Sequence, residues 1–150
     1  LTQAWLVLSQ IREARGDAAG TEAALTAAIA ASPANIELLL ARAGFEARRQ
    51  RTDDALGWYR RALALDANRA DAWLGMSIAA VYGQRPELAL EYAEKAQALA
   101  TTSPDPLVVK AMAHAILGRK EEAKEAAARA RALAPGMQLP QELERLLAPP

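Results

Sequence analysis

The residues with the greatest chemical reach in this sequence are few, and they form no familiar catalytic or metal-binding set. His114 is the only histidine and cysteine is absent. Histidine pairs, thiolate metal sites, disulfides and cysteine nucleophiles are therefore excluded within one chain. Ser9 and Ser77 occupy a position that is small in every repeat described below, which favours packing over nucleophilic catalysis. We interpret His114 as a helix-interface residue; a proton donor, or a ligand to a partner's metal, is the alternative.

Charged residues gather at predicted helix ends and not in a catalytic arrangement. Asp53 and Asp54 open a helix, where negative side chains complement the helix dipole, and this role is favoured over acid–base catalysis. Five arginines cluster nearby: Arg48, Arg49, Arg51, Arg60 and Arg61. We interpret them as solvated side chains at a helix end, with contact to an acidic partner as the alternative. The stretch from Arg119 to Arg131 mixes both signs, as a solvent-facing helix does.

Composition narrows the function classes further. The glycines are isolated, so no phosphate-binding loop is present. We therefore expect no enzyme activity, no cofactor and no metal. The formal net charge of the 150 residues is zero, which argues against a general nucleic-acid or anionic-membrane surface. No apolar run reaches the roughly 18 residues that a membrane span needs. Residue 1 is leucine and no signal peptide is visible, so we expect a fragment or processed form, cytoplasmic or periplasmic.

The element that organises the chain is the stretch from Asp54 to Ala67, DALGWYRRALALDA. Leu56, Tyr59 and Leu63 recur at spacings of three and four, so one face of a helix is apolar. A lone amphipathic helix of this length is marginal in water and must pack on a neighbour. The neighbours are copies of the same pattern.

An internal repeat of constant length runs through the sequence. A shift of 34 aligns large residues at Trp5, Leu39, Trp73 and Leu107, and small residues at Ser9, Ala43, Ser77 and Ala111. It also aligns Ala28, Ala62, Ala96 and Ala130. No insertion interrupts residues 2 to 137, which gives four repeats: 2–35, 36–69, 70–103 and 104–137.

At these positions the sequence resembles the tetratricopeptide repeat family, and the resemblance covers about nine-tenths of the chain. Each single position is a weak signal, whereas four copies in phase are a strong one. The units also depart from the family pattern. Position 7, usually Leu, is Arg42 in the second repeat and Lys110 in the fourth. Position 11, usually Tyr, holds Arg12, Glu46, Ala80 and His114.

The resemblance implies an all-α fold, a right-handed superhelical solenoid of antiparallel helix pairs in a single domain over 1–150. First helices are expected near 3–15, 36–49, 70–83 and 105–117, and second helices near 18–31, 52–65, 86–99 and 120–133. Leu139, Leu143, Leu146 and Leu147 predict a short capping helix at about 139–148. We interpret Pro149 and Pro150 as the start of a linker or as an artificial end point of the expressed segment.

In such a solenoid the first helix of each repeat lines the concave side, so the resemblance also implies a binding groove. We predict that the groove is an apolar trough with acidic residues along one rim. Its predicted residues are Leu6, Gln10, Glu37, Leu40, Gly44, Arg48, Asp71, Leu74, Ile78, Tyr82, Asp105, Val108 and Met112. Self-covering, or purely structural packing between first helices, is the alternative.

The predicted partner is a protein or peptide with apolar anchors, with basic flanks to meet Glu37, Asp71 and Asp105. The acidic tails of chaperones are not expected to bind, because family members that bind them use Lys, Asn and Arg in the groove. The matching positions here are Leu6, Gln10, Ala41, Asp71 and Gly75. The sequence thus predicts a non-catalytic protein-interaction module. The alternatives are an oligomerisation or scaffolding arm of a larger polypeptide, attached to an enzyme or a cell-envelope or secretion assembly protein, and end-to-end self-assembly.

Overall fold

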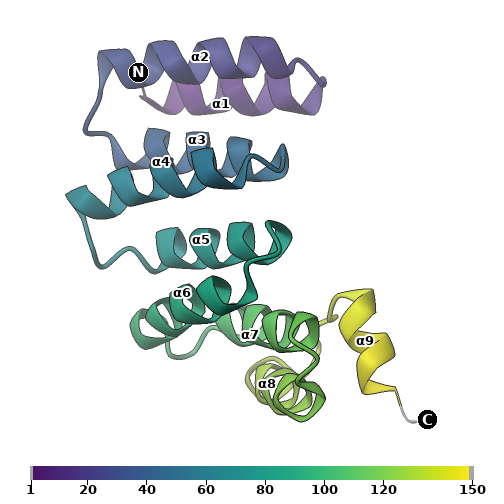
Figure 1. Cartoon of the computed structure of the whole chain (residues 1–150). Coiled ribbons are helices and arrows are strands. Elements are labelled where there is room, and N and C mark those ends of the chain that lie inside the picture. Colours follow the sequence, from purple (N-terminus) through teal and green to yellow (C-terminus); the bar gives the residue numbers. More distant parts are fainter. Residues whose placement is uncertain (1, 149–150) are drawn as a thin grey trace. The chain divides into compact units, whose positions relative to one another are not determined.

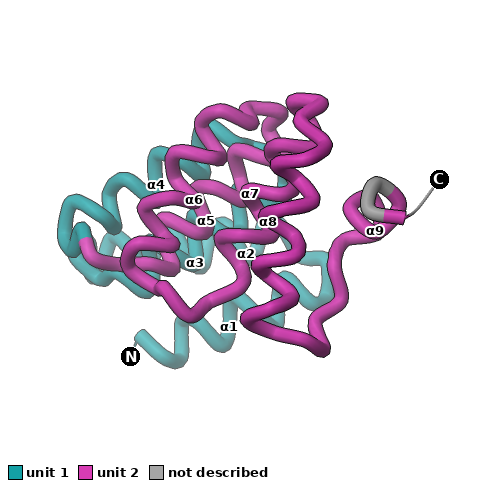
Figure 2. The backbone as a smooth tube through the Cα atoms, turned by 90° about the horizontal axis from the view of Figure 1, so that it is seen from below, with its two compact units in different colours: residues 1–67 teal, residues 68–150 magenta. Residues whose placement is uncertain are grey.

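The computed structural model describes residues 2–148, with only the backbone for residues 146 and 147. Within that range the chain is helical, without strands, and falls into two compact units, residues 1–67 and 68–150 (Figure 2). Each unit holds the helices of two of the four predicted repeats. The capping-helix side chains of Leu146 and Leu147, and the linker prediction for Pro149 and Pro150, lie outside the described residues.

Unit 1 consists of two helical hairpins (Figure 1). Its helices are α1 (Thr2–Ala14), α2 (Ala18–Ala31), α3 (Ile36–Arg48) and α4 (Thr52–Leu65). Unit 2 repeats the pattern with α5 (Ala70–Tyr82), α6 (Pro86–Leu99), α7 (Asp105–Ile116) and α8 (Lys120–Leu133). A final short helix, α9 (Gln141–Leu147), packs on α7 and α8. These bounds confirm the all-α prediction and match the predicted helices to within one or two residues.

The four hairpin turns share one backbone geometry, which occurs at the same position of each repeat. Gly16, Gln50, Gln84 and Gly118 all have positive φ angles, of 73°, 59°, 56° and 72°. In the first turn the Gly16 N–H donates to Glu13 O and the Asp17 N–H to Arg12 O. This pairing is a Schellman motif, which ends a helix by satisfying its last carbonyls, and the other three turns repeat it. Glycine adopts this conformation without steric cost, whereas glutamine adopts it at a cost in free energy because of its Cβ.

Small residues set how closely the two helices of a hairpin approach. The alanines of the repeat are almost fully buried: Ala28, Ala55, Ala62, Ala89, Ala96, Ala123 and Ala130 are each at most 1% exposed. Thr21 takes the place of one of them and donates its hydroxyl to Asp17 O at 2.8 Å. Larger side chains at these positions would push the helix pair apart, because protein interiors have no spare volume.

Each unit has its own apolar core cluster. In unit 1, Leu38 and Leu39 of α3 pack with Ala28 and Ile29 of α2, and Trp5 of α1 and Trp58 of α4 cover this cluster. In unit 2, Leu139 and Leu143 pack on Ala111, Ala126 and Ala127 of α7 and α8. The first helices are thereby held at fixed positions, and their remaining faces carry the candidate site.

Candidate functional site

The first helices of unit 2 line an apolar pocket of about 270 Å³. Leu74, Ile78 and Tyr82 follow one another at every fourth residue of α5 and so share a face. Val108 and Met112 of α7 line the pocket from the other side, with Asp105 at the start of that helix. Val81 and Val109 complete the lining. The pocket thus brings together six of the seven groove residues that the sequence predicts in this unit.

Asp71, the seventh predicted residue, does not line the pocket. Its carboxylate is instead held by the Arg69 guanidinium, with Nε and Nη2 donating at 2.9 and 2.6 Å. These hydrogen bonds, with further help from the Arg69 charge and the Ala72 N–H, lower the pKa of Asp71, although partial burial opposes the shift. The negative charge of Asp71 is therefore balanced by Arg69, the residue that precedes α5. The sequence pattern did not reveal this pairing.

A second pocket, of about 330 Å³, continues from the first. The two share Val81, Tyr82 and Met112. The second extends past Ala115 and Ile116 at the end of α7 and reaches Glu142 and Leu143 of α9; Gln84 also lines it. We call the two pockets together the unit 2 groove. The contribution of α9 was not predicted, because the leucine spacing identified α9 as a cap without giving its direction.

Apolar side chains of this groove are exposed to solvent. Tyr82 is 66% exposed, Ile116 41% and Ile78 38%. The charged residues among the groove lining are Asp105 and Glu142, and both are acids. An exposed apolar surface of this kind, with a few polar groups at its border, is typical of a binding site.

One ion pair helps to fix the α9 wall of the groove. Arg131 Nη2 donates to both carboxylate oxygens of Glu144, at 2.6 and 2.7 Å. This contact lowers the pKa of Glu144. Leu139 is 6% exposed and Leu143 1%, so α9 is also anchored by apolar burial. A helix of seven residues has little stability of its own, so these contacts decide where it lies.

Unit 1 has a smaller pocket, of about 170 Å³, at the corresponding place. Five of its six predicted residues line it: Leu6, Gln10, Leu40, Gly44 and Arg48. Glu37 does not line it. The rim is polar, because Arg48 binds Glu13 through two hydrogen bonds of 2.6 and 2.8 Å. The Arg48 guanidinium also lies over Gly44, where an added Cβ would meet Nη1 at 3.2 Å. This pocket is therefore partly filled by the protein's own side chains.

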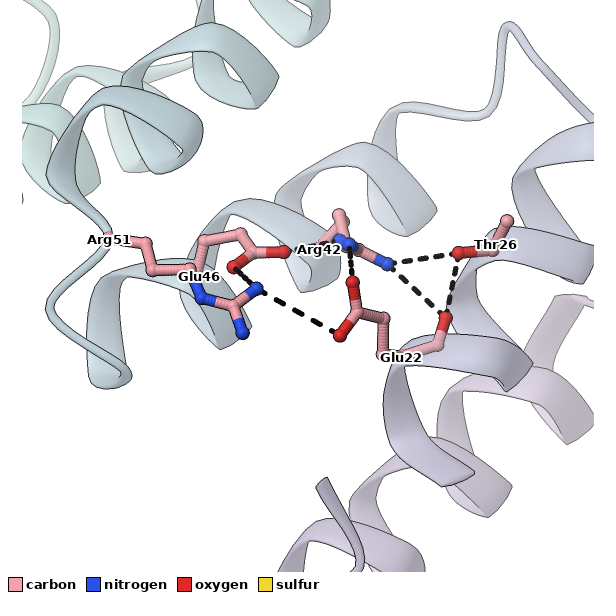
Figure 3. Close-up of polar contacts among 5 residues, drawn as sticks. All are labelled: Glu22, Thr26, Arg42, Glu46 and Arg51. Atoms are coloured by element: carbon pink, nitrogen blue, oxygen red, sulfur yellow. Dashed lines mark hydrogen bonds and ion pairs between the residues drawn. The ribbon is translucent and has the colours of Figure 1, made fainter. Parts of the chain in front are cut away.

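The two non-consensus residues of the second repeat form a charged cluster (Figure 3). Arg42 Nε lies 2.7 Å from Glu46 Oε1, as an ion pair whose N–H direction is poor for a hydrogen bond. Arg42 also reaches across to α2, donating to Glu22 Oε1 at 2.8 Å and to Thr26 Oγ1 at 3.0 Å. Arg51 donates to the second oxygen of Glu46 at 3.1 Å. Arg42 is 7% exposed and Glu46 1%.

This cluster joins two hairpins and does not resemble a catalytic dyad. Each carboxylate is paired with a guanidinium, as in a structural ion-pair network. Arg42 also lies 5.7 Å from the ring centre of Phe45 and 5.5 Å from that of Trp58. Cations at such distances are attracted to the ring face. Two arginines of the predicted basic cluster also lie over these rings. The Arg61 guanidinium lies 4.4 Å from the Trp58 ring centre, and that of Arg49 lies 5.5 Å from the Phe45 ring centre.

His114 lies half-buried on α7. Its Nδ1 is buried and makes no hydrogen bond. Burial lowers its pKa, as do the charges of Arg119 and Lys110, while Glu122 and Glu125 act in the opposite direction. Burial thus disfavours the charged imidazolium, and the interface role of His114 stays a prediction. Within residues 2–148 no cluster of three metal-ligating side chains occurs, and no helix there is long and apolar enough to cross a membrane.

Comparison with solved structures identifies the fold. The crystal structure of MamA superimposes with a TM-score of 0.80 at 20% identity, covering 97% of this chain and 78% of that chain. A thermophilic TPR protein in Thermus thermophilus gives 0.78 at 19% identity, covering 98% and 79%. PilW, a widely conserved type IV pilus biogenesis factor, gives 0.85 at 19% identity, covering 97% and 70%. No protein-family profile and no curated protein sequence matches the chain.

Proposed function

The chain has the fold of tetratricopeptide-repeat proteins, and we propose that it is a non-catalytic module that binds a segment of a partner protein in the unit 2 groove. The observation that carries this proposal is the exposure of Ile78, Tyr82 and Ile116 along one continuous apolar lining. Isolated exposed apolar residues are common on protein surfaces, whereas a contiguous lined groove is not.

The unit 2 groove fits a peptide segment better than it fits a small molecule. Its two pockets share Val81, Tyr82 and Met112 and follow one another along α7, so a ligand must be elongated to use both. Burial of about four aliphatic side chains contributes roughly 6–12 kcal/mol before the costs of association. Those costs amount to several kcal/mol, so a dissociation constant in the micromolar range or weaker is expected.

The experiment is a selection of displayed random peptides on the immobilised chain, followed by fluorescence anisotropy with the enriched peptides. Ile78→Glu should weaken binding by at least about 30-fold, because one apolar contact is lost and a charge is placed against an apolar ligand. Leu99→Glu is the matched control, since Leu99 lies in the same unit, is 43% exposed and does not line the groove. It should bind as the unchanged chain does.

Two results would count against the proposal. One is enrichment of no peptide above the level that the Ile78→Glu protein gives. The other is equal loss of binding in Ile78→Glu and Leu99→Glu. In either case a scaffolding role, with contacts made through other surfaces, becomes the better explanation. Circular dichroism of each variant separates a loss of binding from a loss of fold.

A further inference from the structure

The groove in unit 2 has a charge at each end and none between. Asp105 is the first residue of α7 and lines the first pocket. Glu142 lies in the first turn of α9 and lines the second pocket, beside Ala115 and Ile116 at the other end of α7. The residues between them in the lining are apolar apart from Gln84 and the hydroxyl of Tyr82.

Neither acid has a cation of its own among the described residues. Asp105 has contacts with Ser103, whose hydroxyl lies 3.4 Å from its carboxylate, and Glu142 has no ion pair. Nearby acids differ, since Asp71 is held by Arg69 and Glu144 by Arg131. The carboxylates of Asp105 and Glu142 are thus not engaged by a guanidinium or an ammonium group of the described residues. Both charges therefore remain available to a ligand.

From this arrangement we infer that the partner segment has an apolar centre with a lysine or arginine at each end, one to meet Asp105 and one to meet Glu142. This inference rests on the proposed function and names the chemistry of its ligand. Complementary charge at the border of an interface guides association and fixes register, while the apolar centre supplies affinity. An acidic segment, a nucleic acid or an anionic lipid surface would meet repulsion at both ends.

The length of α7 sets the spacing of the two basic residues. Asp105 and Ala115 are ten residues apart on one helix, which corresponds to about 15 Å at 1.5 Å per residue. A helical ligand would then carry its basic residues about ten positions apart. An extended ligand, at about 3.3 Å per residue, would carry them about five positions apart. A second copy of this chain does not supply such a segment through its own α9, because two of its seven residues are acids and only one is basic.

The peptides selected on the unchanged chain test this inference. Enriched sequences should have Lys or Arg at both borders of an apolar core, with one of the two spacings. Asp105→Lys and Glu142→Lys should each weaken the selected peptides by about three- to tenfold, and raised salt should remove most of the difference. Glu121→Lys is the matched control: Glu121 also lies in the first turn of a helix in unit 2, outside the groove lining. It should leave affinity unchanged, as should Asp71→Asn.

The outcomes separate the two proposals. Peptides that need Ile78 but lack basic ends, or that bind the Asp105→Lys and Glu142→Lys proteins as tightly as the unchanged chain, would overturn the inference and leave the groove intact. The absence of any Ile78-dependent peptide would overturn both. Asp105→Asn and Glu142→Gln, which remove the charge without reversing it, keep the test valid if either lysine variant folds poorly; each should weaken the peptides by a smaller factor.

Discussion

In each unit, position 12 of the first repeat and position 13 of the second repeat lie on neighbouring first helices. These two residues are charged in unit 1 and apolar in unit 2. In unit 1 they are Glu13 and Arg48, which form a two-fold hydrogen-bonded ion pair at the rim of a small pocket. In unit 2 they are Val81 and Ile116, which line a larger, apolar pocket. The backbone frame is shared, so these side chains account for much of the difference between a filled and an open groove.

A second pair of positions also differs between the two units. In the second repeat of each unit, position 7 is Arg42 in unit 1 and Lys110 in unit 2, and position 11 is Glu46 in unit 1 and His114 in unit 2. Arg42 and Glu46 are buried in a charged cluster that ties α3 to α2. Lys110 reaches α6 only through the more exposed Glu94 and Gln97, at 3.8 and 3.3 Å. Unit 1 thus has a buried ion pair at these positions, whereas Lys110 of unit 2 pairs with a more exposed carboxylate.

The largest predicted effect comes from breaking the buried cluster. Arg42→Leu should lower the free energy of unfolding by about 3 kcal/mol, because Glu46 loses its nearest cation while buried. Lys110→Leu, the same position in unit 2, should change it by less than about 1 kcal/mol. Urea unfolding followed by circular dichroism measures both.

The double variant Arg42→Leu/Glu46→Tyr restores residues typical of the family and should recover most of the lost stability. Replacement of a buried ion pair by well-packed apolar side chains is often neutral or stabilising. If the double variant is as unstable as Arg42→Leu alone, an unpaired Glu46 is not the cause of the loss.

The hairpin turns give a comparison within each unit. One turn has glycine and the other glutamine at the left-handed position, Gly16 and Gln50 in unit 1 and Gly118 and Gln84 in unit 2. Gln50→Gly and Gln84→Gly should each raise the free energy of unfolding by about 0.5–1 kcal/mol, since backbone strain is relieved while the unfolded chain gains some freedom. Gly16→Ala should lower it, although an added Cβ there meets no atom within 4 Å. A rise in thermal midpoint on Gly16→Ala would show that alanine adopts the left-handed conformation at this position without strain.

Exchange of the rim residues tests the comparison of the grooves directly. Glu13→Val/Arg48→Ile gives unit 1 the apolar rim of its counterpart and removes an ion pair whose arginine side chain is 59% exposed. Stability should change by less than about 1 kcal/mol. Binding of an apolar fluorescent dye should increase, because the pocket loses its polar rim. Unchanged dye fluorescence would mean that the rim residues do not separate the two pockets.

The smallest expected effect is a pH dependence from His114. Its pKa is lowered in the folded state, so below the unfolded value of about 6.5 the unfolded chain binds more protons and stability falls. The contributions of Asp71 and Glu144, whose pKa values are also lowered, are lost only as the pH falls below about 4. His114→Gln should therefore flatten the urea midpoint between pH 7.5 and 5.5. A midpoint that falls equally in both proteins would assign the effect to other groups.

The helices and their order could be predicted from sequence because the signals are local and repeated. Leu56, Tyr59 and Leu63 define a helical face within two turns or so, and the constant repeat length shows that the pattern recurs. The register of the repeat also placed Leu74, Ile78 and Met112 on the faces that line the groove in unit 2. Whether that groove binds a partner stays a prediction.

Contacts between residues far apart in sequence, and contacts that depend on a side chain's rotamer, came from the folded structure. The sequence alone determined an all-α repeat architecture, its helix limits and the faces of its first helices, because each depends on neighbours within a few turns or on exact periodicity. It did not show that Arg48 is bound by Glu13, that Arg42 pairs with both Glu46 and Glu22, or that Glu142 of α9 lines the groove. Those pairings depend on the packing of separate helices, where a change of a few ångströms alters which charges meet.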